Sequence, residues 1–120
     1  LAQAIVSIPG CKAMALGDGV QSASQPGSEV HDIPVFGKRG LRHETNRAGV
    51  VTGGVTNGEP VVVHGMMKPI STLLKPLRTV DLKTRQPAKA HYERSDVCVA
   101  PAAGVVGAAT VALFLASAVP

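Results

Sequence analysis

The sequence has few aromatic side chains, with two Phe, one Tyr and no Trp among 120 residues. Proteins that bind single-stranded nucleic acid stack the bases on aromatic rings, and this chain offers no such platform. Lys and Arg outnumber Asp and Glu by 12 to 8, but the basic residues are spread along the chain and never form a run of five. We therefore expect no nucleic-acid partner. A small anionic ligand, such as a phosphate or carboxylate, fits this charge better, and an ordinary basic surface is the alternative.

Cysteine is equally scarce, because Cys11 and Cys98 are the only two. A disulfide framework needs more cysteines, and a zinc site needs further ligands at short spacings. We expect no metal site and interpret both cysteines as small buried residues in a reducing compartment. No basic segment precedes an apolar stretch near the N-terminus, so a secretory signal is not expected.

Charge is absent from residues 97–120. This length is sufficient for a membrane-spanning helix. However, Pro101 falls in the first turn, Ala and Gly supply most of the segment, and no aromatic or basic anchor follows it. A helix of small residues packed inside a protein core has the same composition. The sequence favours this core helix and leaves a membrane anchor as the alternative.

The remaining pattern predicts one small α+β domain of mixed antiparallel strands and helices. Asn57-Gly58 lies between two apolar runs, which is a strong hairpin signal. The expected elements are a helix end at 1–8, an extended run at 11–16, a turn at 17–19, a long loop at 21–45, a hairpin of 50–55 and 60–67 turned at 56–58, a strand and turn at 75–89 and a long apolar helix within 97–120.

Three segments carry residues suited to ligand binding. Residues 45–58 are rich in glycine, which lets a backbone approach a flat ligand, although such hairpins are more often simple turns. Residues 67–72 (MKPIST) offer a lysine, a rigid proline and two hydroxyls, which suit a phosphate or a polar ring edge. Arg94 could hold an anion bidentately, and Asp96, two residues later, could accept a proton. If each segment is considered alone, the ordinary alternatives are a solvated lysine for MKPIST and a surface ion pair for the segment of Arg94 and Asp96.

Taken in order, these motifs resemble the chorismate synthases, and the resemblance runs from residue 1 to residue 120. The matching motifs are SIPG at 7–10, GDG at 17–19, GS at 27–28, HD at 31–32, TNRAG at 45–49, GGVTNG at 53–58, MKPIST at 67–72, TVDL at 79–82, RSD at 94–96 and PAAGVV at 101–106. So many ordered motifs do not coincide by chance.

The resemblance implies the C-terminal segment of an enzyme that converts 5-enolpyruvylshikimate 3-phosphate to chorismate by 1,4-elimination of phosphate. The family uses reduced FMN, and the resemblance leaves NADPH open as an external or intrinsic reductant. It also implies a cytoplasmic homotetramer of β-α-β sandwiches, with no membrane partner and with residues 97–120 as a buried core helix. By motif, Asp96 would handle the proton. The expected flavin contacts are Pro9, Gly10, Gly53, Lys68, Pro69, Ile70, Ser71, Thr72 and Arg94.

The chain also departs from the family pattern. Val50 stands where the family usually has a second glycine, His64 replaces an expected arginine, and Ile33 replaces an acidic residue. Residues 107–109 read Gly-Ala-Ala where a Glu-containing segment is common. The family's catalytic histidines and several substrate-binding arginines lie N-terminal to the matched region. We therefore expect the 120 residues alone to be inactive, and a non-catalytic relic is the alternative to an enzyme segment.

Overall fold

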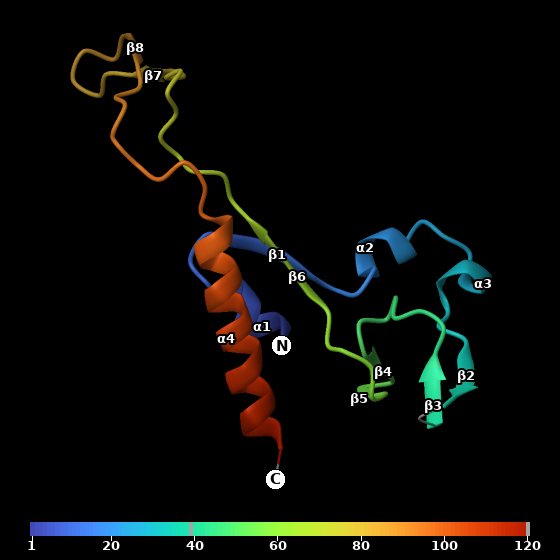
Figure 1. Cartoon of the computed structure of the whole chain (residues 1–120). Coiled ribbons are helices and arrows are strands. Elements are labelled where there is room, and N and C mark those ends of the chain that lie inside the picture. Colours follow the sequence, from blue (N-terminus) through green and yellow to red (C-terminus); the bar gives the residue numbers. More distant parts are fainter. Residues whose placement is uncertain (39, 120) are drawn as a thin grey trace.

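The computed structural model describes residues 1–38 and 40–119 and shows an extended α+β molecule (Figure 1). Its principal extents are 69 × 36 × 22 Å and its radius of gyration is 20.5 Å. A compact domain of this length would have a radius of gyration of about 14 Å. The mixed antiparallel α+β class is confirmed, but the chain does not close around a single core.

The centre of the molecule is a two-stranded antiparallel ribbon of β1 (Cys11–Leu16) and β6 (Val63–Met67). The expected extended run at 11–16 is thereby confirmed. A short helix, α1 (Ala2–Val6), precedes β1 and packs against it. Ile5, Cys11 and Ala15 are buried where these elements meet.

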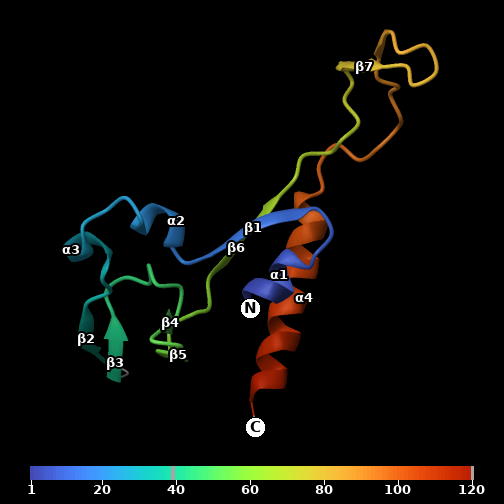
Figure 2. The same cartoon turned by 180° about the vertical axis from the view of Figure 1, so that it is seen from behind.

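The long C-terminal helix, α4 (Ala100–Ala118), is confirmed as a helix, with Pro101 in its first turn, where a missing backbone N–H costs nothing. It packs against α1 and β6 (Figure 2). The expectation of a buried helix is wrong for this chain, because none of its described residues is buried. By length and composition α4 could also cross a membrane. It lacks a polar face, so one side packs on the ribbon and its other apolar sides remain exposed.

The expected long loop at 21–45 is only partly correct, because this segment contains ordered elements. Two single-turn helices, α2 (Gly19–Ser22) and α3 (Gly27–Val30), come first. A hairpin follows, in which β2 (Pro34–Gly37) pairs with β3 (Gly40–His43). These strands are four residues long and mostly exposed, so the apolar alternation that identifies a strand is too short to be recognised in the sequence.

The predicted pairing of 50–55 with 60–67 is wrong. β4 (Val51–Thr52) pairs with β5 (Val55–Thr56), and the turn between them is Gly53-Gly54 rather than Asn57-Gly58. Both glycines of this turn have positive φ, +59° and +81°, as a tight two-residue hairpin turn requires. The run that was expected to complete the hairpin instead supplies β6, which pairs with β1.

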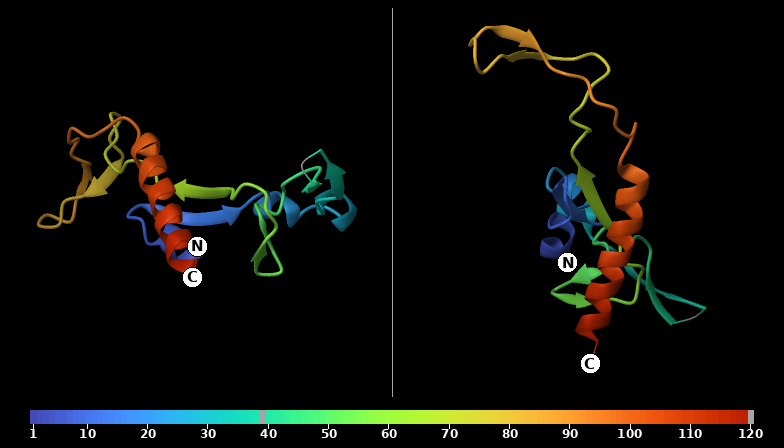
Figure 3. Two further views of the ribbon diagram at one scale, coloured as in Figure 1. Left: turned by 60° about the horizontal axis from the view of Figure 1, so that its bottom comes forward. Right: turned by 90° about the vertical axis from the view of Figure 1, so that its left-hand side faces the viewer.

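A second hairpin, β7 (Arg78–Val80) and β8 (Pro87–Lys89), confirms the expected strand and turn at 75–89. Asp81 begins the turn, and its carboxylate accepts hydrogen bonds from the N–H groups of Lys83 and Thr84. These bonds hold the pKa of Asp81 below its ordinary value. Figure 3 shows the hairpin projecting as an arm beyond the N-terminal end of α4.

Candidate functional site

The predicted residues Pro9, Gly10 and Lys68 come together at one end of the central ribbon. Because Cys11 pairs with Met67, the residues just outside the ribbon, Gly10 and Lys68, are also neighbours. The Lys68 N–H donates a hydrogen bond of 2.8 Å to the Gly10 carbonyl. Gly10 has a φ of +85°, and a Cβ at this position would lie 3.3 Å from the Met67 methyl group. A larger residue at position 10 would therefore disturb the backbone contact that positions Lys68.

A hydroxyl pair brings a third motif to the same end of the ribbon. Thr72 Oγ1 and Ser95 Oγ are hydrogen-bonded at 2.6 Å, although the residues are 23 positions apart. Ser95 lies between Arg94 and Asp96, so this contact places the RSD segment beside the MKPIST loop. The predicted residues 9–10, 68–72 and 94–96 are thus joined by one backbone and one side-chain hydrogen bond.

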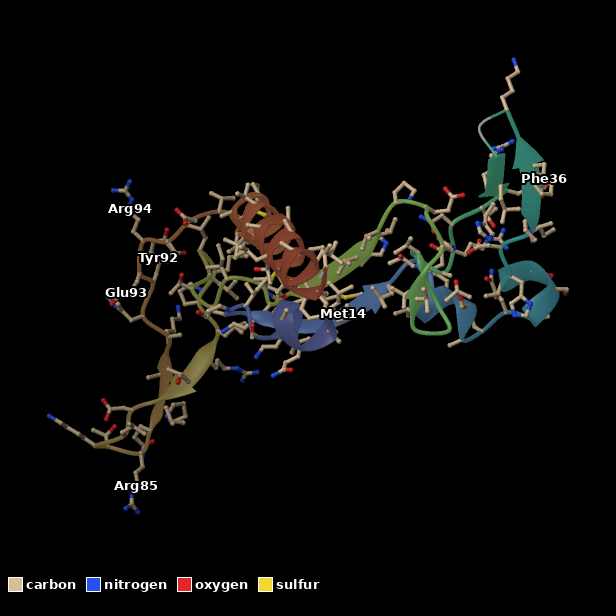
Figure 4. The ribbon with its side chains drawn as sticks, turned by 90° about the horizontal axis from the view of Figure 1, so that it is seen from below. Met14, Phe36, Arg85, Tyr92, Glu93 and Arg94 are labelled. Atoms are coloured by element: carbon tan, nitrogen blue, oxygen red, sulfur yellow. The ribbon has the colours of Figure 1, made fainter. Side chains whose placement is uncertain are left out.

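The cluster is open to solvent. Lys68, Pro69, Ser71, Arg94 and Asp96 are all exposed. Figure 4 shows the Arg94 side chain pointing outward from the chain, next to Tyr92 and Glu93. The joined segments thus provide two cations, hydroxyl donors and one carboxylate that are open to solvent. Such a donor set fits the phosphate and the polar ring edge of a flavin mononucleotide.

Gly53 is not brought to this cluster. It lies in the β4–β5 turn, beyond the opposite end of the ribbon (Figure 1). A six-residue strand such as β1 separates its two ends by roughly 17–20 Å. No atom of the described chain lies within 4 Å of a Cβ built on Gly53, so this glycine faces open space.

The sequence motifs did not assign a role to Asp32, which anchors the TNRAG segment. Its carboxylate accepts hydrogen bonds from Thr45 Oγ1 at 2.5 Å, from Arg47 N at 2.8 Å and from Ala48 N at 3.0 Å. Burial raises the pKa of Asp32, but these three bonds and the nearby His43 outweigh burial and lower the pKa below its ordinary value. The HD motif was the only sequence signal, and it does not reveal a partner 13 to 16 residues away.

The TNRAG segment also contacts the residues that precede α2. Asp18 N donates to the Arg47 carbonyl at 2.7 Å, and Gly17 N donates to the Val62 carbonyl at 3.0 Å. A Cβ on Gly17 would lie 2.1 Å from the Arg47 oxygen, which no side chain can accommodate. The glycine of GDG is therefore required by a backbone contact and not only by a turn.

Val50 follows directly and has an unusual conformation. Its φ is +84°, which disfavours a β-branched residue, and its side chain is only 1 % exposed. The sequence comparison with the family pattern expected a glycine at this position. The structure gives the physical reason for that expectation, because glycine adopts positive φ without strain.

Among residues 1–38 and 40–119, no three His, Cys, Asp or Glu side chains are grouped to hold an ion. Cys11 is buried as expected, but Cys98 is exposed, so its predicted burial is wrong for this chain. His43 lies against Glu59, with Nδ1 3.5 Å from Oε1, while its backbone N–H donates to the same oxygen at 2.7 Å.

Comparisons with known proteins agree with the motif pattern. The family described as chorismate synthase matches residues 1–119. A chorismate synthase of Moorella thermoacetica is 54% identical over 120 residues, covering 99% of this chain and 31% of the relative. One from Solibacter usitatus is 53% identical over 121 residues, covering 98% and 31%. A solved structure titled "Crystal Structure of Chorismate Synthase" superposes with a TM-score of 0.69 at 33% identity, covering 95% of this chain and 27% of that one. The chain thus spans about a third of the length of its curated relatives.

Proposed function

Because the chain belongs to the chorismate synthase family, we propose that residues 1–120 are the C-terminal segment of such an enzyme. The proposed reaction is the reduced-FMN-dependent 1,4-elimination of phosphate from 5-enolpyruvylshikimate 3-phosphate, a carbon–oxygen lyase reaction of aromatic biosynthesis. The proposal includes a cytoplasmic, homotetrameric enzyme to which this segment contributes one side of the flavin and substrate site. The identity of 54% to a chorismate synthase over nearly the whole chain supports it.

The observation that carries the site assignment is the joining of three motifs at one end of the ribbon. The Lys68–Gly10 backbone bond and the Thr72–Ser95 hydroxyl pair hold them together without any ligand. A site whose backbone is already fixed binds with a smaller loss of conformational entropy. Pro9, Pro69 and Ile70 add rigid or apolar surface on which a flat ring can lie.

Each polar residue has a role that follows from its chemistry. The Lys68 ammonium and the Arg94 guanidinium supply positive charge for phosphate and carboxylate groups, and Arg94 can do so bidentately. Ser71 and Thr72 offer hydroxyl donors to a polar ring edge. Asp96 holds or accepts a proton, and its place two residues from Arg94 keeps it near the bound anion. When bound, reduced FMN supplies electron density to the reaction centre as phosphate departs. Gly53, at the far end of the ribbon, remains a separate flavin contact in this proposal.

We expect the isolated chain to be inactive for a physical reason. Every described polar residue of the proposed site is exposed except Thr72, which is half-buried. Elimination of phosphate is accelerated by preorganised charges in a site that excludes water. An open surface with two cations cannot provide that environment.

A graft tests the proposal directly. The matched region of the Moorella thermoacetica enzyme is replaced by these 120 residues, and anaerobic chorismate formation is measured with reduced FMN. We expect activity, a loss of FMN affinity of about tenfold in Lys68→Gln, and a fall in kcat of about a hundredfold in Asp96→Asn. Lys83→Gln, in the exposed β7–β8 turn, is the matched control and should change neither value. Supplying NADPH with oxidised FMN instead tests an intrinsic reductase activity.

Two other outcomes would contradict the proposal. A folded graft that binds FMN but forms no chorismate would favour a non-catalytic relic, for which the strained Val50 is the supporting observation. Chorismate formation by the isolated chain would refute the expected dependence on a further segment.

The membrane-anchor alternative rests on the length and composition of α4. It predicts that the chain partitions into detergent and resists alkaline washing.

A further inference from the structure

A hollow lies at the opposite end of the ribbon from the proposed flavin surface. It has a volume of about 420 Å³, within the range of small-ligand pockets. It forms between the end of β1, α2, the residues around Asp32 and the β4–β5 hairpin. The polar residues on its lining are Ser22, His31, Asp32, His43, Arg47, Thr52 and Asn57.

Arg47 is the most firmly placed of these residues. Its N–H donates to Asp32 at 2.8 Å and its carbonyl accepts from Asp18 N at 2.7 Å, so its backbone is fixed on both sides. The residue as a whole is half-buried. Within residues 1–38 and 40–119, no carboxylate forms an ion pair with Arg47. A guanidinium without an ion-pair partner retains its capacity to bind an anion.

Asn57 adds an oriented donor. Its side-chain oxygen accepts the Glu59 N–H at 3.1 Å, and its own backbone N–H donates to the Val50 carbonyl at 3.2 Å. Because the amide oxygen accepts the Glu59 N–H, the two side-chain N–H groups of Asn57 can donate hydrogen bonds to a ligand. Ser22, half-buried on α2, supplies a hydroxyl on the same lining.

The one carboxylate on the lining does not abolish this donor character. Asp32 accepts three hydrogen bonds from the TNRAG segment, so its oxygens are directed to Thr45, Arg47 N and Ala48 N. It fixes the segment that carries Arg47. Glu59 is not on the lining, and its Oε1 accepts the His43 backbone N–H at 2.7 Å.

We propose that Arg47, Asn57 and Ser22 form a subsite for a phosphate group, either free phosphate or the phosphate of an ester. A guanidinium, an amide N–H pair and a hydroxyl all belong to residues on the lining of this one hollow, and phosphate oxygens accept hydrogen bonds from each of these groups. The subsite stands on this geometry and does not require the flavin role of the Lys68 end.

The test is an NMR titration of the ¹⁵N-labelled chain with sodium phosphate against sodium chloride at matched ionic strength. We expect a saturable shift of the Arg47 Nε–H and Asn57 side-chain signals. Arg47→Gln should weaken binding at least about tenfold. Asn57→Asp keeps the acceptor for Glu59 N–H but replaces the donor by a carboxylate, so it should also weaken binding. Arg85→Gln, in the distant β7–β8 turn (Figure 4), is the control and should not.

Equal weakening by Arg47→Gln and Arg85→Gln would overturn the proposal, because it would show non-specific attraction to a basic chain. So would a shift that never saturates. Parallel titrations with FMN and riboflavin identify the source of the phosphate. If FMN shifts these signals and riboflavin does not, the ligand is a phosphate ester, and a response to inorganic phosphate alone identifies the free ion. Lys68→Gln should weaken flavin binding at the other end of the ribbon about tenfold while leaving the phosphate response intact, so the two proposals fail separately.

Discussion

Val50 allows backbone strain to be measured separately from burial. With a φ of +84° it occupies the left-handed region, and with 1 % exposure it is among the most buried side chains of the described residues. Replacing it by alanine removes buried methyl groups but leaves a Cβ in the strained conformation. Replacing it by glycine removes the Cβ as well. The comparison between the two variants therefore isolates the strain.

The magnitude follows from three contributions. At an ordinary buried strand position, glycine is less stable than alanine by about 0.8 kcal/mol of lost Cβ burial and about 0.5–1 kcal/mol of chain entropy. At position 50, removing the Cβ from the left-handed region restores about 1–2 kcal/mol. We expect the stability gap between Val50→Gly and Val50→Ala to be smaller than the ordinary gap by about 1–2 kcal/mol, so that the two variants have nearly equal stability.

The assay is urea unfolding followed by circular dichroism at one temperature, with free energies extrapolated to water. The control is Val63 in β6, a half-buried strand valine without positive φ. There, Val63→Gly should be less stable than Val63→Ala by the ordinary gap. If the Gly–Ala gaps at positions 50 and 63 are the same, then Val50 is not strained and this reasoning is wrong.

Two further predictions concern the TNRAG region. Gly17→Ala should destabilise the chain by about 3 kcal/mol or more, because its Cβ would meet the Arg47 carbonyl and its φ is positive. Gly53→Ala, with positive φ but open space around it, should lose only about 1–2 kcal/mol in the same urea assay. Asp32 has a folded pKa below its ordinary value of 3.8, so its hydrogen bonds stabilise the fold above that pH and lose their effect as pH falls through the folded pKa. Melting curves from about pH 5 to about pH 2 should show a shallower acid decline for Asp32→Asn than for the unchanged chain.

Local signals in the sequence predicted the elements that are set by local physics. The extended run at 11–16 ends just before Gly17, and α4 begins at Ala100 with Pro101 in its first turn. Both features can be recognised from a few neighbouring residues. The pairing of β6 was not predictable in this way. Its partner lies some fifty residues earlier, and the choice of β1 over the β4–β5 run depends on the apolar surface that α1 and α4 present.

The candidate site was predictable as a set of motifs but not as an arrangement. Nothing local links Gly10 to Lys68, since this contact depends on the register of the β1–β6 ribbon. Nothing local links Thr72 to Ser95 either, because that contact depends on the path of the chain through the β7–β8 arm. The role of Asp32 was missed for the same reason. A carboxylate that caps backbone N–H groups far along the chain leaves no pattern of spacing in a single sequence.

The exposed apolar surface and the open site have one physical cause. The buried hydrophobic residues of the described chain are Ile5, Cys11, Ala15 and Val50, while large apolar residues of α4 and of the β7–β8 arm remain in water. So few buried side chains offset little of the conformational entropy of ordering a chain of this length. An apolar groove runs between α4 and the ribbon, lined by Ile5, Met67, Gly104 and Val111 among others. It runs along the ribbon from Val63 to Met67, so one of its ends adjoins Gly10 and Lys68. A further segment that covers this groove would therefore add to the stability of the fold and exclude water from the proposed site in a single step, so stability and activity should increase together.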